Sequence, residues 1–405
     1  MHFTGRLHRL WRGALLSLAV LGLLASAGCG GSGGSGGTAQ TGAQGSNPIK
    51  VGFNFELSGD VATFGQHTWN GAQMALDEIN AKGGVLGRKL EPDKLDNKGD
   101  NAESTNVTTR LVSDGVVAII GPATTGDSLG AIPVITSAKI PLIPTSATAV
   151  PVTVDENGKV RDWVFRVCFI DPVQGVVGAD FAYDQLNARK AVILEDSTND
   201  YSKGLAAAFK QEFVKKGGQV LAERGFAKGD QDFRSVLSSF KALQPDLIYV
   251  PAYYDKVGII VRQARDMGIT VPMMGGDGWD SPDLVKLAGA AALNNTFFTN
   301  HYSSGDPDPK VQDFVKAYKA RYGDGPDGFA ALGYDAVYLL ADAIKRAGSA
   351  EPDKIRQALA STKDFQGVTG NISMDAQHNP VKPVIILEMK DGQQVFKARI
   401  TPQQG

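Results

Sequence analysis

Short apolar runs of strand length alternate along this chain with segments whose apolar residues recur at helical spacing. The run at residues 49–55 predicts a buried strand, and Ala72, Ala75, Leu76 and Ile79 then fall on one helical face. The alternation returns with apolar runs at residues 116–120, 191–194 and 246–250, and with helical spacing at residues 204–216 and 257–264. This repeated order predicts an α/β fold of two doubly wound parallel sheets with helices on both faces.

The first residues follow a different pattern, which is typical of an exported protein. Arginines precede an apolar run at residues 15–28, which is too short for a membrane-spanning helix and ends in small residues before Cys29. This layout resembles a bacterial lipoprotein signal, so we expect residues 1–28 to be removed and Cys29 to carry a lipid anchor. Ser26 stands where such signals usually have an aliphatic residue, and an ordinary secretory signal with a chance cysteine is the alternative.

Residues 29–47 are small, polar and rich in Gly and Ser, which predicts a flexible linker. The remaining segment of about 360 residues is long enough for two lobes, each with its own core. A formal net charge of −2 argues against a nucleic-acid partner held on a basic surface. Because Cys29 and Cys168 are the two cysteines, acylation of Cys29 leaves no disulfide, and we expect Cys168 to be a small buried strand residue.

Three loops that follow apolar runs are rich in hydroxyl and carboxylate side chains, namely residues 121–127, 144–148 and 274–279. In doubly wound folds ligands bind at the carboxyl ends of the strands, so these loops are candidate ligand sites. The first loop enters a helix, where free N–H groups and the hydroxyls of Thr124 and Thr125 favour an anion. In the third loop, glycines on both sides expose Asp277. Ordinary helix capping and turn chemistry are the alternative for each loop.

Several motifs, in their order and spacing, establish a family resemblance over nearly the whole chain beyond the linker. They are Phe55-Glu56-Leu57-Ser58-Gly59, Phe64-Gly65, Asn70-Gly71-Ala72, the stretch at residues 79–87, Tyr201-Ser202-Lys203-Gly204 and the stretch at residues 262–268. Together they resemble the type I periplasmic solute-binding proteins of the leucine/isoleucine/valine-binding class. The resemblance implies two lobes joined by three crossings, which close on a ligand. The N-terminal lobe is expected at residues 48–168 plus 300–380, and the C-terminal lobe at residues 169–299 plus 381–405.

The same resemblance implies a set of ligand-binding residues. Thr125, Ser146 and Thr148 match positions that hold the ligand's α-carboxylate or orient its α-amino group, and Asp277 matches the acid that pairs with the ammonium. Branched-chain binders carry Glu there, so the shorter Asp277 has to be compensated by the position of the ligand or by a water. The remaining matches are the aromatic residues Phe64, Tyr201, Tyr253 and Phe329 around the ligand side chain, and Ala123 in the first loop. Thr124 of the same loop is a further candidate ligand-binding residue because of its hydroxyl group. The small Ala123 indicates extra room, and Trp279 either lines the pocket or packs beneath its loop.

The expected function follows from the charges of such a ligand. A zwitterion in a water-poor cleft loses hydration at both ends, so both ends need partners, and partners on different lobes favour closure. We therefore expect a membrane-anchored extracytoplasmic protein that captures a branched-chain, other aliphatic or aromatic α-amino acid for an ABC permease. Binding of amides, urea or aromatic acids, and sensing in place of uptake, are alternatives. A fixed negative charge at Asp277 favours an amino acid over a neutral amide.

Catalysis finds little support in the sequence. It contains no P-loop, no nucleophile elbow and no metal-ligand spacing. The histidines are scattered, at His2, His8, His67, His301 and His378. We expect no enzyme activity, no cofactor and no bound metal, with an enzyme on a doubly wound scaffold as the more remote alternative. His67 is interpreted as a surface or solvated residue, with a position at the cleft near Phe64 as the alternative.

Overall fold

The computed structural model describes residues 47–401. The predicted signal peptide, the lipidation site Cys29 and the linker up to residue 46 lie outside the described residues, so these expectations stay predictions. Within residues 47–401, no helix has both the length and the apolar character needed to cross a membrane.

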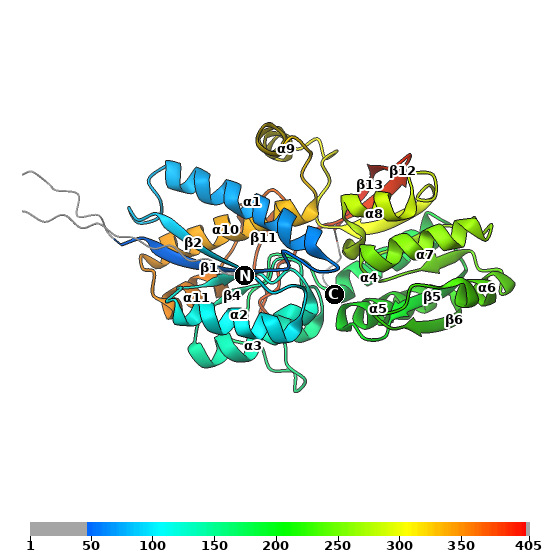
Figure 1. Ribbon diagram of the computed structural model, residues 1–405, viewed down its shortest axis with the longest axis horizontal. Helices are drawn as coiled ribbons and strands as arrows, with labels where there is room; N and C mark the ends of the chain where they lie inside the picture. The colour runs from blue at the N-terminus through cyan, green and yellow to red at the C-terminus, as the bar shows by residue number, and fades with distance from the viewer. Residues whose placement is uncertain (1–46, 402–405) are drawn as a thin grey trace, which may run out of the picture. The chain divides into compact units, whose positions relative to one another are not determined.

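A four-stranded parallel sheet forms the centre of the first lobe (Figure 1). Its order is β2 (Leu90–Asp96), β1 (Ile49–Phe55), β3 (Ile119–Ile120) and β4 (Leu142–Ile143). The lobe also contains α1 (Ala62–Ala81), α2 (Asn101–Ser113), α3 (Thr125–Ala138), α10 (Gly328–Ala347), α11 (Pro352–Ala360) and the hairpin of β10 (Phe365–Gly367) and β11 (Gly370–Ile372). Successive strand residues point to opposite faces, so Ile120 packs with α1 and α10 whereas Ile119 packs with α2 and α3. Helices therefore cover both faces.

The second lobe contains a seven-stranded mixed sheet. Its order is β13 (Gln393–Ile400), β12 (Val384–Lys390), β9 (Thr296–Asn300), β8 (Met273–Gly275), β7 (Leu247–Tyr249), β5 (Lys190–Asp196) and β6 (Gln219–Phe226). The strands from β9 to β6 are parallel, but β12 runs antiparallel to β9 and to β13. Core residues of α4 (Asp171–Asp184) and α5 (Asp200–Lys215) cover one face, and those of α6 (Arg234–Ala242), α7 (Tyr254–Asp266) and α8 (Pro282–Ala288) the other. The sequence analysis predicted only parallel strands and missed this antiparallel edge.

The chain passes three times between the lobes, after β4, after β9 and after β11. The second passage also carries α9 (Pro309–Tyr322). The predicted fold, two doubly wound lobes joined by three crossings, is confirmed. Cys168 lies in the first passage and is buried, as predicted, but in a bend and not in a strand. The strand prediction was wrong because the apolar run around Cys168 connects the sheets and pairs with neither at that point.

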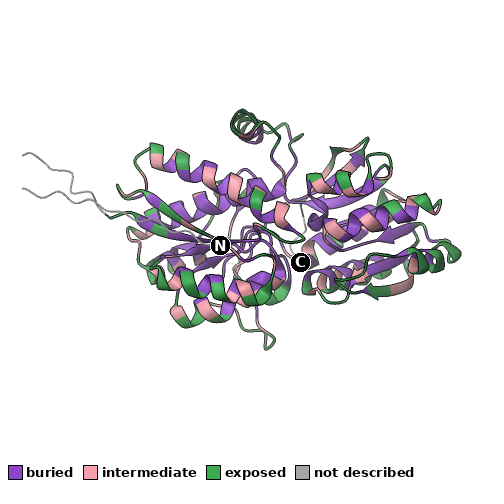
Figure 2. Ribbon diagram, viewed as in Figure 1, coloured by how far each residue is buried: buried purple, intermediate pink, exposed green. Residues whose placement is uncertain are grey.

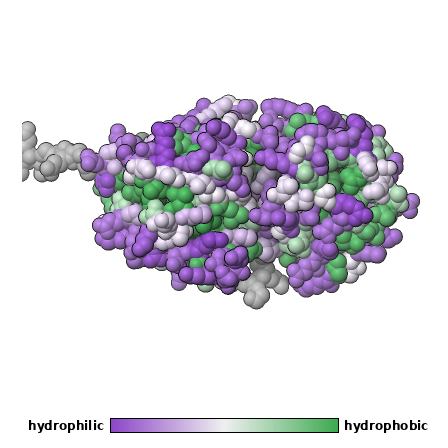
Figure 3. All heavy atoms as spheres, turned by 60° about the horizontal axis from the view of Figure 1, so that its bottom comes forward, coloured by the Kyte–Doolittle hydropathy of each residue, from purple (hydrophilic) through white to green (hydrophobic). Residues whose placement is uncertain are grey.

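Burial follows the two sheets closely, with most strand segments buried (Figure 2). On the face shown in Figure 3, polar side chains predominate and apolar ones gather in smaller patches. The large apolar residues that are exposed within residues 47–401 come from separate parts of the fold: Leu86, Val150, Val176, Val214, Leu243, Val381 and Val395. Exposed apolar residues spread in this way are ordinary for a folded domain.

Two glycines allow α1 and α10 to cross in close contact. A Cβ atom on Gly71 would lie 1.8 Å from the carbonyl oxygen of Ala330, and one on Gly333 would lie 2.1 Å from that of Thr68. Neither position has room for a methyl group. The crossing brings together Phe64 of α1 and Phe329 of α10, whose rings stack at 4.1 Å between centroids.

We predict that Gly71→Ala lowers the free energy of unfolding by about 1–3 kcal/mol, because the added methyl group forces the two helices apart. Denaturant unfolding measures the change. Gly178→Ala is the matched control, since Gly178 is also inside a helix and its nearest atom would be at an ordinary 3.4 Å. The control should be neutral or stabilising, because Ala favours helix by about 1 kcal/mol over Gly. Equal stability of Gly71→Ala and wild type would contradict the close crossing.

Candidate functional site

Loops at the carboxyl ends of strands from both lobes meet around a small cavity. Its lining residues are Phe64, Ala123, Thr124, Ser146, Tyr201, Tyr253, Asp277, Gly278 and Phe329, all of which except Gly278 are predicted ligand-binding residues. The pairing of β3 with β4 sets the two loops of the first lobe side by side, and the N–H of Thr145 donates to the carbonyl oxygen of Pro122 at 3.2 Å. The sequence analysis and the structure therefore indicate the same part of the fold.

Two of the predicted residues do not line this cavity. Thr125 is buried at the start of α3, where its Oγ1 accepts a hydrogen bond from the N–H of Ala149 at 3.5 Å. Thr148 is fully buried beside Asp171. Burial raises the pKa of the Asp171 carboxyl group, and Thr148 opposes part of that rise. Both residues support the wall from behind, and contact with a ligand stays a prediction for them.

Four aromatic rings, those of Phe64, Tyr201, Tyr253 and Phe329, line the cavity. Phe64 stacks on Phe329, packs edge-to-face on Tyr253 at 5.4 Å, and Tyr253 stacks on Tyr201 at 5.1 Å. The cavity has a volume of about 10 Å³, which is room for roughly one water molecule. A larger cavity of about 650 Å³ adjoins it and shares Thr124 and Tyr253 with it. A ligand of amino-acid size does not fit into the small cavity unless the rings or the lobes move apart.

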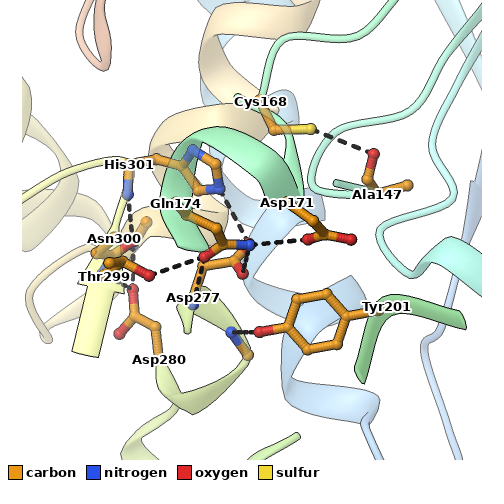
Figure 4. A network of polar contacts seen from close by, with 12 residues as sticks. Ala147, Cys168, Asp171, Gln174, Tyr201, Asp277, Asp280, Thr299, Asn300 and His301 are labelled. Carbon is orange, nitrogen blue, oxygen red and sulfur yellow. Dashed lines mark hydrogen bonds and ion pairs between the residues drawn. The ribbon is translucent and has the colours of Figure 1, made fainter. Parts of the chain in front are cut away.

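Asp277 supplies the carboxylate of the cavity. It lies in η2 (Asp277–Trp279), directly after β8, and is 3% exposed. Gln174 Nε2 donates to Asp277 Oδ1 at 3.0 Å, and His301 Nε2 lies 3.0 Å from Asp277 Oδ2 (Figure 4). The hydroxyl of Tyr201 accepts a hydrogen bond from the N–H of Gly278 at 3.1 Å. Each oxygen of the buried carboxylate thus has a protein donor while Asp277 still faces the cavity.

A second buried carboxyl group, that of Asp171 at the start of α4, lies close behind. Gln174 Nε2 also donates to Asp171 Oδ1 at 3.0 Å and so bridges the two acids. Burial, with the charge of Asp277, raises the pKa of Asp171 to about 7. Burial lowers the pKa of His301 to about 4, so its imidazole is neutral at neutral pH. Since the Asp277 carboxylate only accepts, the hydrogen-bond pattern assigns the proton of His301 to Nε2.

The opposite wall holds another pair of acids, Glu56 and Asp127. The buried Glu56 accepts hydrogen bonds from the N–H of Thr124 at 2.9 Å and from that of Ala123 at 3.2 Å. Burial, with the adjacent charge of Glu56, raises the pKa of Asp127 to about 9. The hydroxyl of Thr124 donates to Asp127 Oδ2 at 2.7 Å. We expected the N–H groups of Ala123 and Thr124 to be free for a ligand anion, but both donate to Glu56. Ser146 of the adjoining loop lines the cavity.

The structure also shows where Trp279 and His67 lie. The sequence left the position of Trp279 open, and the interpretation of His67 was different. Trp279 is fully buried and its Nε1 donates to the carbonyl oxygen of Val250 at 2.9 Å, so it packs beneath the loop. The side chain of His67 is 26% exposed and pairs with Asp327 at 2.5 Å, and this carboxylate raises the pKa of His67 to about 9. The interpretation of His67 as a solvated residue was wrong because the start of α10 brings Asp327 against it.

Sequence reasoning missed Glu56, Asp171, Gln174 and His301 as parts of the site. Glu56 belongs to the motif at residues 55–59, but nothing in that motif indicates that its carboxylate accepts hydrogen bonds from the N–H groups of Ala123 and Thr124. Gln174 is 103 positions away from Asp277 along the chain, so their contact has no local signal. Within residues 47–401, no group of three or more His, Cys, Asp or Glu side chains is placed to hold a metal ion.

The Asp127 pKa predicts a pH dependence. In the folded protein Asp127 keeps its proton up to about pH 9, whereas in the unfolded chain it loses the proton near the ordinary pKa of 3.8. The contribution of Asp127 to the free energy of unfolding therefore falls as the pH rises from about 3.8 to about 9. Asp127→Asn stays neutral throughout and can still donate to Glu56. We expect its melting temperature to fall less than that of wild type between about pH 5 and about pH 8. The exposed Asp313→Asn is the control, and equal pH slopes for Asp127→Asn and wild type would contradict the assignment.

Comparisons with known proteins agree with this geometry. A family model described as periplasmic binding protein matches residues 48–394. The branched-chain amino acid transporter substrate-binding protein LivJ of Streptococcus pneumoniae, solved in complex with isoleucine, is 40% identical with a TM-score of 0.82, over 88% of this chain and 100% of that one. The leucine-binding protein LivK of Thermotoga maritima is 37% identical with a TM-score of 0.83, over 87% of this chain and 99% of that one. The Leu/Ile/Val-binding protein BraC3 of Rhizobium johnstonii is 30% identical over 327 residues, which are 80% of this chain and 87% of the relative. These relatives are solute-binding proteins and not enzymes, and this chain belongs to the periplasmic binding protein family.

Proposed function

We propose that this protein captures an α-amino acid with a branched-chain, other aliphatic or aromatic side chain and delivers it to an ABC importer. One observation carries the proposal: a buried, hydrogen-bonded carboxylate, Asp277, faces an aromatic-walled cavity whose other side is formed by Ser146 and the start of α3. The carboxylate suits the ammonium of the ligand, and the hydroxyl of Ser146 suits its carboxylate. The rings of Phe64 and Phe329 suit an apolar side chain.

Charge and position together explain why such a ligand favours closure. Asp277 belongs to the second lobe and Ser146 to the first, so a zwitterion held at both ends bridges the lobes. Only the closed arrangement offers both partners at once, and the ligand therefore shifts the population towards it. Closure also removes water, which strengthens each of these polar contacts.

The relatives narrow the ligand and the setting. LivJ was solved with isoleucine and LivK is named for leucine, which supports a branched-chain amino acid for this chain as well. LivJ is described as the substrate-binding protein of a branched-chain amino acid transporter, which supports permease subunits as partners. The match to the periplasmic binding protein family supports an exported, extracytoplasmic location. The membrane anchor of this proposal is the lipidated Cys29 that the sequence predicts.

A ligand screen combined with Asp277→Asn tests the proposal. The chain from Asn47 onward is unfolded and refolded to remove carried-over ligand and is then screened against amino acids, urea and simple amides by thermal shift. We expect α-amino acids to raise the melting temperature, and Asp277→Asn to weaken their binding by calorimetry about a hundredfold or more, because the ammonium loses its counter-charge. Asp313→Asn, on the exposed side of α9, is the control. A response to amides alone, or full affinity in Asp277→Asn, would overturn the proposal.

The anchor is tested separately with Cys29→Ser in the full chain expressed in a bacterial host. We expect wild type in the membrane fraction with a covalently bound acyl label. The variant is expected in the soluble extracytoplasmic fraction without the label, because the lipid is attached through the thiol of Cys29. If wild type and variant fractionate alike, the ordinary secretory signal is the correct reading.

A further inference from the structure

Asp277 is held by hydrogen bonds from two residues that belong to separate parts of the chain. Gln174 of α4 donates to its Oδ1, and His301, the first residue after β9, faces its Oδ2, each at 3.0 Å (Figure 4). A carboxylate with a donor on each oxygen has a fixed plane, and its remaining lone pairs have fixed directions. The orientation of this carboxylate is therefore set before any ligand contacts it.

Gln174 is itself fully constrained. Its Nε2 donates to Asp277 Oδ1 and to Asp171 Oδ1, and its Oε1 accepts from Thr299 Oγ1 at 2.8 Å and from the N–H of Asp277 at 3.4 Å. An amide side chain offers two donors and one acceptor oxygen with two lone pairs, and all four are used here. Gln174 thus cannot rotate without breaking several buried hydrogen bonds.

His301 is held by packing instead. It is 3% exposed, and its ring stacks on Phe169 with 3.6 Å between centroids and 28° between planes. Phe169 lies in the first passage between the lobes and His301 begins the second, so the ring that faces Asp277 is placed by two of the three crossings. Its Nδ1 has no hydrogen-bond partner within residues 47–401, which leaves Asp277 as the polar contact of this imidazole ring.

We propose that His301, together with Gln174, is a positioning residue that orients the Asp277 carboxylate to receive the α-ammonium group of the ligand. This inference rests on the proposed function. A neutral imidazole donates a hydrogen bond and leaves the negative charge of Asp277 for the ligand, whereas a permanently cationic side chain at this position would neutralise it. The pair therefore selects ligands with an ammonium group over analogues of the same shape that lack one.

The test compares two variants of His301 in the purified full chain. His301→Phe keeps a ring to stack on Phe169 but has no donor, and His301→Gln restores an N–H donor without the ring. Each protein is titrated by calorimetry with leucine, isoleucine and valine and with their 2-hydroxy acid analogues, which lack the ammonium. We expect His301→Phe to lose about tenfold to a hundredfold in affinity for the amino acids and to change little for the hydroxy acids. His301→Gln should recover part of the loss.

The outcomes separate this inference from the proposed function. If wild type binds none of the three amino acids, the branched-chain form of the proposed function fails, and the inference fails with it. If wild type binds them and His301→Phe binds them equally well, or loses amino acids and hydroxy acids alike, the positioning role is overturned while the proposed function stands. The melting temperature without ligand shows whether each variant folds, and His301→Met, which also lacks a donor, replaces the Phe variant if that one does not fold.

Discussion

Buried negative charge is the constraint on which the rest of the site depends. The carboxyl groups of Glu56, Asp127, Asp171 and Asp277 all lie in or behind the cavity walls, where water is scarce. A buried carboxylate has to find donors or keep its proton. Asp127 and Asp171 have raised pKa values for this reason, and Glu56 takes the N–H groups at the start of α3. Asp277 instead finds Gln174 and His301, and so it stays available as the acceptor that faces the cavity.

The aromatic rings of the cavity wall also form a contact between the two lobes. Phe64 belongs to a helix of the first lobe, yet it packs among core residues of the second, next to Tyr253 and Tyr254. In this arrangement apolar contact between the lobes occupies the space that an apolar side chain of a ligand would take. In the proposed function, binding exchanges ring–ring contacts for ring–ligand contacts, which would make the shape of the ligand side chain matter.

The sequence predicted much of this arrangement because the signals were local. Periodicity located β1, β3, β5 and β7. Loops at the carboxyl ends of parallel strands lie at one edge of the sheet, so the predicted loop residues were expected to lie close together. The antiparallel β12 and β13 were not predicted as strands, and a short apolar run such as residues 384–387 does not indicate the direction of its strand. Thr125 and Thr148 lie in the predicted loops, but the paths of those loops turn them behind the wall.

By itself, the sequence determined the two-lobed α/β fold, the loops that carry the site and the acid, Asp277, that faces the cavity. Tertiary structure alone decided what those residues contact. Glu56 reaches the start of α3 only because β1 lies beside β3, and His301 reaches Asp277 only because two interlobe passages stack through Phe169. Hydrogen bonds between residues so far apart along the chain depend on how the packing of the elements positions each backbone segment. The residue pattern within a single segment does not predict that position.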